Sequence, residues 1–446
     1  MSIVKDVLNF VAKELLTAFD SDAISKGADV DTVPGDVDIR ITLMSQDGQR
    51  KYNLISQCTG VEIYESITSP AMFAELFISD SMGLYQSFPL IGEEFVLIEL
   101  KSPDKTGLKS ARYLFRADEI RDKKVGENNK NVTYTIPLYS AELIDNAKVY
   151  VNKTYEDSVN NIVKNIFEEY IKSEKPIKID DTTGVEKVTI TRLQPFRAID
   201  FLRRRSISNK YLSSSFVFYE NRDGYNFTTI EKLLFEGSKK IGFGSDKRFF
   251  FDTARKENIK DVTNRNIIAY NQITNGSQLS QIQTGGFTSI QQTYDIISGG
   301  IRRVSYTDNV GGDKFKLGSD SAASKNTTDF VRQHGKTTAV VNIKPTAGDR
   351  PEMNIGESMV SRRAFANKVA QNITQIHIYG DTELSIGDVI KCDLPAAIDS
   401  NDNKGKSRLD SGNYLVSKLR HMITIGDRPQ HTMSLELIRG FLEETA

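Results

Sequence analysis

The 446-residue sequence contains no tryptophan, two cysteines and four histidines. The two cysteines, Cys58 and Cys392, are too few for a disulfide framework in a chain of this size, which favours a reducing compartment such as the cytoplasm. We expect no metal site built on them. The histidines form no His-Glu-x-x-His pattern of the kind that binds catalytic zinc, and we interpret them as surface residues or hydrogen-bonded strand residues.

The chain also lacks an excess of charge of either sign. Lys and Arg number 58 and Asp and Glu number 59, so no global basic field indicates nucleic acid as a partner. Long hydrophobic runs are missing as well. Lys5, Asp6, Lys13 and Glu14 interrupt the apolar N-terminal stretch, which therefore falls short of the roughly 20 apolar residues of a membrane span. We expect neither an export signal nor stable membrane insertion.

What the sequence does contain is a series of short strands. Two apolar runs, Phe73–Ile78 and Phe95–Leu100, are bounded by turn-forming residues. Asp38–Leu43 and Val132–Leu138 alternate apolar and polar residues, as half-buried strands do. The hydrophobic content of 39% is ordinary for a globular protein, and the length allows two to four domains. The pattern predicts a mainly β protein.

The first residues predict an amphipathic helix followed by a linker. The apolar positions recur every three or four residues, and they are Val4, Leu8, Val11, Leu15 and Phe19. The stretch 21–38 is polar and rich in Asp. A tethered helix of this kind either docks on another subunit or lies on its own body, and the stripe alone does not decide between the two.

A compact α+β region is expected after the first strands. Apolar residues from Val159 to Ile171 have the spacing of an amphipathic helix, with Thr154 as its expected N-cap. A second helix is expected to begin near Pro195. The hairpin that follows contains Asp223-Gly224, which tolerates the positive dihedral angles of a tight turn.

The densest basic cluster, Arg203, Arg204 and Arg205, lies at the end of that second helix. It is either a solvated helix end that complements the helix dipole or a contact with another subunit or with nucleic acid. Both interpretations stay open at this stage. Together with the N-terminal apolar stripe, these arginines are the candidate subunit-interface residues.

A pattern of four elements occurs twice in the chain. Each copy has an alternating strand, a turn glycine followed by an acidic residue and another strand, a strand containing a Tyr-Leu pair, and a final strand. The copies are 73–78 with 373–378, Leu90–Val96 with Ser385–Ile390, Tyr113-Leu114 with Tyr414-Leu415, and Thr133–Leu138 with Thr432–Leu437. Chance similarity between β proteins could give such a match. We nevertheless interpret it as one barrel-like unit used twice.

Catalytic motifs are mostly absent from the sequence, and the Ser-x-x-Lys spacing of Ser102 and Lys105 lacks the companion motifs of a serine acylase. The paired carboxylates Glu93-Glu94 and Glu168-Glu169 are adjacent, so neither a strand nor a helix brings both to one bond. We expect no catalytic residue, no cofactor and no metal ligand, and we predict that the protein is not an enzyme. The expected domains are 1–38 (helix and linker), 39–149 (first tube-like β-barrel domain), 150–239 (small α+β domain) and 240–446 (a strand-rich region and the second tube-like β-barrel domain).

Three stretches resemble the central baseplate hub (tail hub) proteins of contractile-tailed bacteriophages, which are related to the hub part of VgrG spike proteins of type VI secretion. They are Leu90–Glu94, Leu193–Leu202 with Phe218–Phe227, and Ser411–Val416 with Arg420-His421. The order and spacing of the elements over roughly residues 40–440 carry the resemblance. The N-terminal 1–38 is not part of it.

The resemblance implies a structural protein of the virion tail baseplate, assembled in the host cytoplasm. Three copies with two barrels each would form a pseudo-sixfold ring that joins the hexameric tail tube to the central spike. The implied partners are a second and third copy of the chain, the tail tube protein, the central spike protein and other baseplate proteins. DNA would only pass through the ring during ejection, and we expect a neutral or acidic lumen.

Three other functions are weighed against this one. The first is the hub of a related contractile injection or secretion system. The second is a tail enzyme that degrades cell wall, which lacks an acid/base pair in the sequence. The third is a carbohydrate- or receptor-binding module, which lacks a tryptophan platform.

Overall fold

The computed structural model describes most of the chain between residues 34 and 439. The described residues are 34–88, 90–104, 107–126, 131–211, 213–241, 247–251, 265–275, 288–294, 299–307, 338–343, 372–395 and 410–439, with Arg362, Ala366, Val369 and Ser407. The predicted N-terminal stripe of Val4, Leu8, Val11, Leu15 and Phe19 lies outside them.

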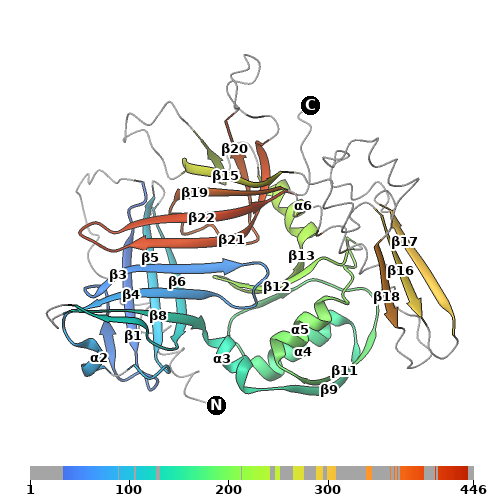
Figure 1. Ribbon diagram of the computed structural model, residues 1–446, viewed down its shortest axis with the longest axis horizontal. Helices are drawn as coiled ribbons and strands as arrows, with labels where there is room; N and C mark the ends of the chain where they lie inside the picture. The colour runs from blue at the N-terminus through green and yellow to red at the C-terminus, as the bar shows by residue number, and fades with distance from the viewer. Residues whose placement is uncertain are drawn as a thin grey trace.

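One 14-stranded sheet dominates the molecule (Figure 1). Its strands are β1 (Asp38–Met44), β2 (Lys51–Asn53), β3 (Cys58–Ser66), β4 (Phe73–Asp80), β5 (Phe95–Asp104), β6 (Gly107–Ala117), β7 (Arg121–Val125), β8 (Val132–Ser140), β14 (Arg248–Phe250), β15 (Ile267–Asn275), β19 (Asn372–Tyr379), β20 (Val389–Asp393), β21 (Gly412–Thr424) and β22 (Gln430–Ile438). The predicted mainly β fold is confirmed.

The sheet contains the same strand order twice. The first unit reads β3-β4-β8-β6-β5, and the second reads β15-β19-β22-β21-β20. The pairing registers agree as well: Leu76 lies opposite Ile136 in the first unit, and Ile376 lies opposite Leu435 in the second. The predicted repetition of strand order is therefore confirmed, and we call the two parts the first and second sheet units.

One β-bulge occurs at the same place in both sheet units, and β15–β19 has a second one, between Gln272 and Thr274, that β3–β4 lacks. The β3–β4 ladder has a bulge between Cys58 and Gly60, and the β15–β19 ladder has one between Ile267 and Ala269, at the matching step. The predicted equivalence of Tyr113 and Tyr414 is two residues out of register. Phe115, not Tyr113, occupies the position of Tyr414, because its partner Val96 on β5 corresponds to the Ile390 partner on β20.

Alternation along the strands separates a core face from a half-exposed face. In β4 every second residue is buried, and β19 and β22 follow the same pattern. Figure 1 shows β1, β5 and β6 crossing behind β3, β4 and β8, and the first core lies between these layers. It contains Ile63, Leu76, Ile98 and Phe115, all at most 1% exposed. A separate core fills the second sheet unit.

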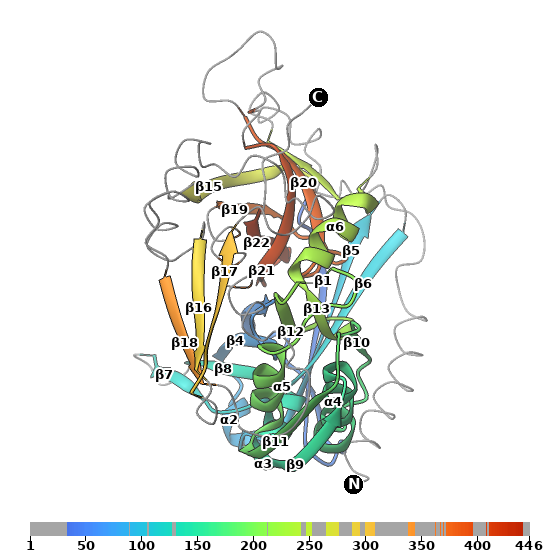
Figure 2. The ribbon, with the colours of Figure 1, turned by 90° about the vertical axis from the view of Figure 1, so that its right-hand side faces the viewer.

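An α+β region packs beside the two units (Figures 1 and 2). It is built from α3 (Ala141–Lys148), β9 (Val151–Asp157), α4 (Val159–Ile166), the π-helical turn η1 (Phe167–Ile171), β10 (Ile177–Ile179), β11 (Glu186–Leu193), α5 (Pro195–Arg203), β12 (Phe216–Asn221), β13 (Gly224–Thr229) and α6 (Ile230–Lys240). Its core is rich in aromatic rings, among them Phe216, Phe218, Tyr225 and Phe227.

The helix expected at 159–171 is present, but its predicted N-cap is wrong. Thr154 lies within β9, opposite Thr189 of β11, and Ser158 precedes the helix instead. Pairing of β9 with β11 outweighed the local capping preference of threonine. The second helix begins at Pro195 as predicted, and Asn221 and Gly224 close the predicted hairpin with a φ of 130° at Gly224.

Two smaller elements complete the description. The short helix α2 (Leu84–Ser87) follows β4. A separate three-stranded sheet consists of β16 (Thr288–Tyr294), β17 (Ile301–Thr307) and β18 (Thr338–Ile343), and Figure 1 places it at the right of the molecule, beyond the α+β region.

Candidate functional site at the junction of the two sheet units

The two sheet units are joined by direct strand pairing. The outer half of β21 pairs antiparallel with β3 over seven positions, from Lys418 opposite Ser66 to Thr424 opposite Gly60. Strands of the two units therefore form one uninterrupted ladder, β15-β19-β22-β21-β3-β4-β8, which Figure 1 shows stacked from top to bottom. Nothing in the sequence indicates this pairing, because period-2 alternation identifies strands but not their neighbours.

A buried polar chain lies on the core side of this junction. The Oη atom of Tyr113 lies 3.2 Å from Nε2 of His421, whose Nδ1 lies 2.9 Å from Nε2 of His431. Glu65 of β3 lies close by, with its Oε1 3.8 Å from His421 Nε2, and Ser385 donates to Glu65 at 3.4 Å. All five residues are less than 7% exposed.

Burial sets the protonation states of these buried polar side chains. It lowers the pKa of His421 to about 3, with a further lowering from nearby Arg222, and it lowers the pKa of His431 well below its usual value. Burial also raises the pKa of Glu65 to about 7, although Arg222 opposes the shift. The histidines are thus neutral hydrogen-bonding groups on strands, as interpreted from the sequence, but Nδ1 of His431 is buried and has no hydrogen-bond partner among the described residues.

The β12–β13 hairpin connects the α+β region to both sheet units. Glu220 of β12 accepts from the backbone N–H of Met72 at 3.0 Å and from the hydroxyl of Ser140, both in the first unit. Lys175 lies 2.5 Å from Glu220 and 2.9 Å from Glu142. Burial raises the pKa of Glu220, and the Lys175 ammonium opposes that shift. The charges are paired, as a buried carboxylate requires.

The same hairpin also contacts the second unit, where its side chains pack against Thr382 and the turn that contains Gly387. Arg222 donates to the carbonyl of Thr382. Gly387 has a φ of 83°, and a Cβ there would lie 2.4 Å from the hydroxyl of Tyr219. In the first unit Gly92 has a φ of 86°, and a Cβ there would lie 2.4 Å from the carbonyl oxygen of Asp118. The repeated glycine of the sequence pattern is thus a close approach in both units.

The acidic residue of the same motif closes the turn. The carboxylate of Glu94 accepts from the backbone N–H groups of Ile91, Gly92 and Glu93 at 2.9 to 3.1 Å. In the second unit Asp388 accepts from the N–H of Ser385 at 3.1 Å. The motif is therefore structural: the acid satisfies backbone donors that the tight turn leaves without a partner.

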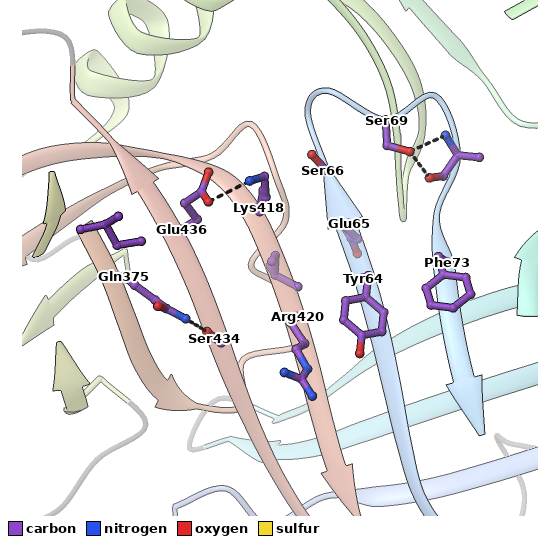
Figure 3. Close-up of a pocket in the computed structure, with 13 residues that line it drawn as sticks. Tyr64, Glu65, Ser66, Ser69, Phe73, Gln375, Lys418, Arg420, Ser434 and Glu436 are labelled. Carbon is purple, nitrogen blue, oxygen red and sulfur yellow. Dashed lines mark hydrogen bonds and ion pairs between the residues drawn. The ribbon is translucent and has the colours of Figure 1, made fainter. Parts of the chain in front are cut away.

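A shallow groove of about 340 Å³ runs over the half-exposed face of the junction (Figure 3). Its labelled residues come from β3, β4, β19, β21 and β22 and from the turn after β3, and they are Tyr64, Glu65, Ser66, Ser69, Phe73, Gln375, Lys418, Arg420, Ser434 and Glu436. Lys418 pairs with Glu436 at 2.9 Å, and Arg420 pairs with Glu62 at 2.5 Å. Both cations of the groove are thus paired with carboxylates, and its lining also includes the apolar residues Ala71, Phe73 and Ile273, so the groove is not basic.

The sequence-predicted arginine cluster lies elsewhere and is bound within the chain. Arg203 pairs with Asp200 at 2.5 Å and donates to the carbonyl of Phe216 at 2.9 Å. Arg204 also pairs with Asp200, at 2.7 Å, and Arg205 pairs with Glu186 at 2.7 Å. The structure does not bring the cluster to the junction, so a subunit contact through Arg203, Arg204 and Arg205 stays a prediction.

Within the described part of the chain, no group of three or more His, Cys, Asp or Glu residues is arranged to hold a metal ion. No helix there is long and apolar enough to cross a membrane.

No protein-family model and no curated protein matches the sequence. Solved structures do match the fold. The 43 kDa tail protein of prophage MuSo2 from Shewanella oneidensis is 10% identical with a TM-score of 0.53, covering 90% of this chain and 99% of that chain. A tail protein from Neisseria meningitidis is 8% identical with a TM-score of 0.50, covering 90% and 96%. A chain of the Francisella PdpA-VgrG complex is 10% identical in sequence with a TM-score of 0.49, and the match covers 100% of this chain and 61% of that chain.

The match to the two tail proteins extends over nearly their whole length and over nine-tenths of this chain. It therefore includes both sheet units and the region between them. This chain has the fold of phage tail proteins, which confirms at the level of the fold the resemblance inferred from its sequence.

Proposed function

We propose that the protein is a structural baseplate hub of a phage tail. Three copies form a ring with pseudo-sixfold symmetry, which joins the hexameric tail tube to the central spike and encloses the channel for DNA ejection. The observation that carries this proposal is the repeated unit with its in-chain junction. Two units in matching registers, already paired edge to edge, supply two sixths of such a ring per chain.

The half-exposed face of the continuous ladder suits the wall of a channel. Its charged residues on β3, β4, β8, β19, β21 and β22 are Glu62, Glu75, Lys418, Arg420 and Glu436. Both cations on this face are paired with carboxylates. Away from the edge strand β7, which carries Arg121, Lys123 and Lys124, this face offers DNA no cluster of cations without carboxylate partners, so DNA can slide past without the tight binding that counterion release gives to basic surfaces.

The remaining parts of the proposal concern partners and location. The ring binds the tail tube protein on one side and the central spike protein on the other, with other baseplate proteins around it. It is assembled in the host cytoplasm and belongs to the virion, with no enzymatic role. The N-terminal stripe of residues 4–19 and the Arg203–Arg205 cluster serve contacts to neighbouring subunits.

Electron microscopy of the assembled tail tests this function. We expect density for three copies of the chain in a ring between tube and spike. One or six copies per ring, or a strongly basic lumen, would overturn the proposal. Purification from an injection system without a capsid would instead favour the hub of a contractile secretion system. Hydrolysis of cell-wall glycan by the pure protein would favour the enzyme.

A further inference from the structure

In the part of the chain that the structure describes, an open edge strand lies at each end of the continuous ladder: β15 at one end, and β7, the neighbour of β8, at the other. Among the strands that the structure describes, β7 pairs only with β8, and β15 pairs only with β19. All five residues of β7 are exposed. Figure 1 places β15 at the upper end of the ladder and β8, the neighbour of β7, at its lower end. Unpaired edges of this kind are templates for another strand.

The internal repeat shows what each open edge corresponds to. β15 occupies the position of β3, because Tyr270 lies opposite Ile376 as Val61 lies opposite Leu76. β7 occupies the position of the outer half of β21. Val125 lies opposite Val132 of β8, and Ile423 lies opposite the corresponding His431 of β22. The two open edges are thus the counterparts of the two strands that pair inside the chain.

Exposure differs sharply between these counterparts. At the in-chain junction Ile423 is 2% exposed and Val61 is 1% exposed. At the open edges Val125 is 56% exposed and Tyr270 is 38% exposed. β15 carries two more exposed apolar residues, Ile268 and Ile273. Apolar side chains at these edges are thus left in water where their counterparts are covered.

We propose that β7 of one copy pairs antiparallel with β15 of the next copy, repeating the β21–β3 junction between chains. The in-chain register transfers directly. Since Ile423 faces Val61, Val125 faces Tyr270 of the neighbouring copy, and since Met422 faces Glu62, Lys124 faces Asn271. The inference rests on the proposed ring and identifies the surfaces that close it.

The basic residues of β7 are compatible with strand pairing. Charged edge strands often serve to prevent association, and β7 carries Arg121, Lys123 and Lys124. However, Arg121 corresponds to Arg420, since each lies opposite the matching residue of β8 or β22. Arg420 lies within the formed junction, opposite Tyr64. A basic residue at this position is therefore compatible with a strand neighbour.

The contact is head-to-tail, because two different edges meet. Such a contact gives a closed ring if the rotation between copies closes and a filament if it does not. The in-chain junction relates two units by the same contact, so three chains alternate in-chain and between-chain junctions around the ring.

Disulfide trapping in the full-length chain tests the pairing. In the double variant Val125→Cys with Tyr270→Cys, directly opposed strand residues come close enough for a disulfide. Mild oxidation should give covalent dimers and trimers, with at least a tenfold excess over the matched pair Val185→Cys with Tyr270→Cys. Val185 is exposed to the same 56% but lies before β11. The native Cys58 and Cys392 are buried and serve as background.

The single variants and the mass of the unmodified protein separate the outcomes. Cross-linking of Val125→Cys alone would indicate a twofold contact and overturn the proposed pairing. Native mass spectrometry that shows trimers without cross-links in the double variant would overturn the pairing and leave the ring intact. Cross-linked oligomers larger than a trimer would support the pairing and contradict the three-membered ring. If neither a cross-link nor a trimer is found, both the pairing and the ring are contradicted.

Discussion

The two sheet units have the same strand order but treat one edge differently. In the second unit β21 is a single 13-residue strand whose outer half pairs with β3. In the first unit the corresponding path is divided into β6 and β7, with residues 118–120 between them and a φ of 53° at Asp122. The first unit therefore ends in an exposed strand, whereas the second continues into its neighbour.

The same strand position can therefore form either an internal seam, as β21 does with β3, or an external edge, as β7 does. The internal seam is reinforced by a buried polar contact between Glu65 of β3 and His421 of β21, and Glu220 with Lys175 ties the first unit to the α+β region beside it. The external edge has only exposed side chains around Val125. Changes at the seam should therefore lower the stability of the single chain, and changes at the edge should affect only association.

The largest loss of stability is expected from Glu220→Ala. This change leaves the ammonium of Lys175 with Glu142 alone and removes one of the two acceptors of the Met72 N–H, the other being the Ser140 hydroxyl. Breaking a buried ion pair costs about 3–5 kcal/mol of unfolding free energy, which urea denaturation would measure. Glu168→Ala, which removes an exposed partner of Lys164, is the control and should change nothing measurable. A loss below about 1 kcal/mol would show that Glu220 does not hold the α+β region to the first unit.

Next in size is a pH effect of Glu65. Its folded pKa of about 7 lies above the usual 4.5, so the folded state binds the proton more tightly than the unfolded state. Protonated Glu65 stabilises the folded state fully below pH 4.5. As the pH rises to 7, the free energy of unfolding falls by about 3 kcal/mol. Glu65→Gln should remove this slope. Because His421 gives an opposite slope between pH 6.5 and 3, the difference between wild type and Glu65→Gln is the quantity to measure. A constant difference between pH 4.5 and 7 would contradict the assignment.

A smaller effect is expected from Gly380→Ala, which overpacks the seam. A Cβ at Gly380 would lie 2.0 Å from Nδ1 of His431, so the buried histidine pair would have to move. Overpacking of this kind costs about 1–3 kcal/mol, measured as the shift of the urea midpoint. Gly426→Ala is the matched control, since no atom lies within 4 Å of its added Cβ. Equal midpoints for both variants would mean that the pair tolerates displacement.

The smallest effect on the single chain is expected from Val125→Glu. Val125 is 56% exposed, so its replacement should leave the urea midpoint unchanged. Assembly should weaken at least tenfold, because the carboxylate would be buried against Tyr270 of the next copy. Val185→Glu controls for added charge at equal exposure. Sedimentation at a series of concentrations compares the two, and indistinguishable association would count against the β7 edge.

The sequence predicted the repeated units well because the responsible signals are local. Alternation identified β4 and β19, and the positive φ of Gly92 and Gly387 follows from tight turns that favour glycine. The junction could not be predicted in the same way, since Ser66 and Lys418 are brought together by tertiary folding alone. The buried polar groups were missed for a similar reason. His421 and His431 alternate with apolar residues at inward positions, which was the only available signal.

The in-chain seam also has an entropic consequence. When two free molecules associate, the loss of translational and rotational freedom costs on the order of 4–15 kcal/mol. β21 and β3 belong to one polypeptide, so their pairing is complete once the chain folds, at any concentration of the protein. In the proposed ring, duplication within the chain would therefore halve the number of separate molecules that must meet, and half of the seams would form before the first encounter.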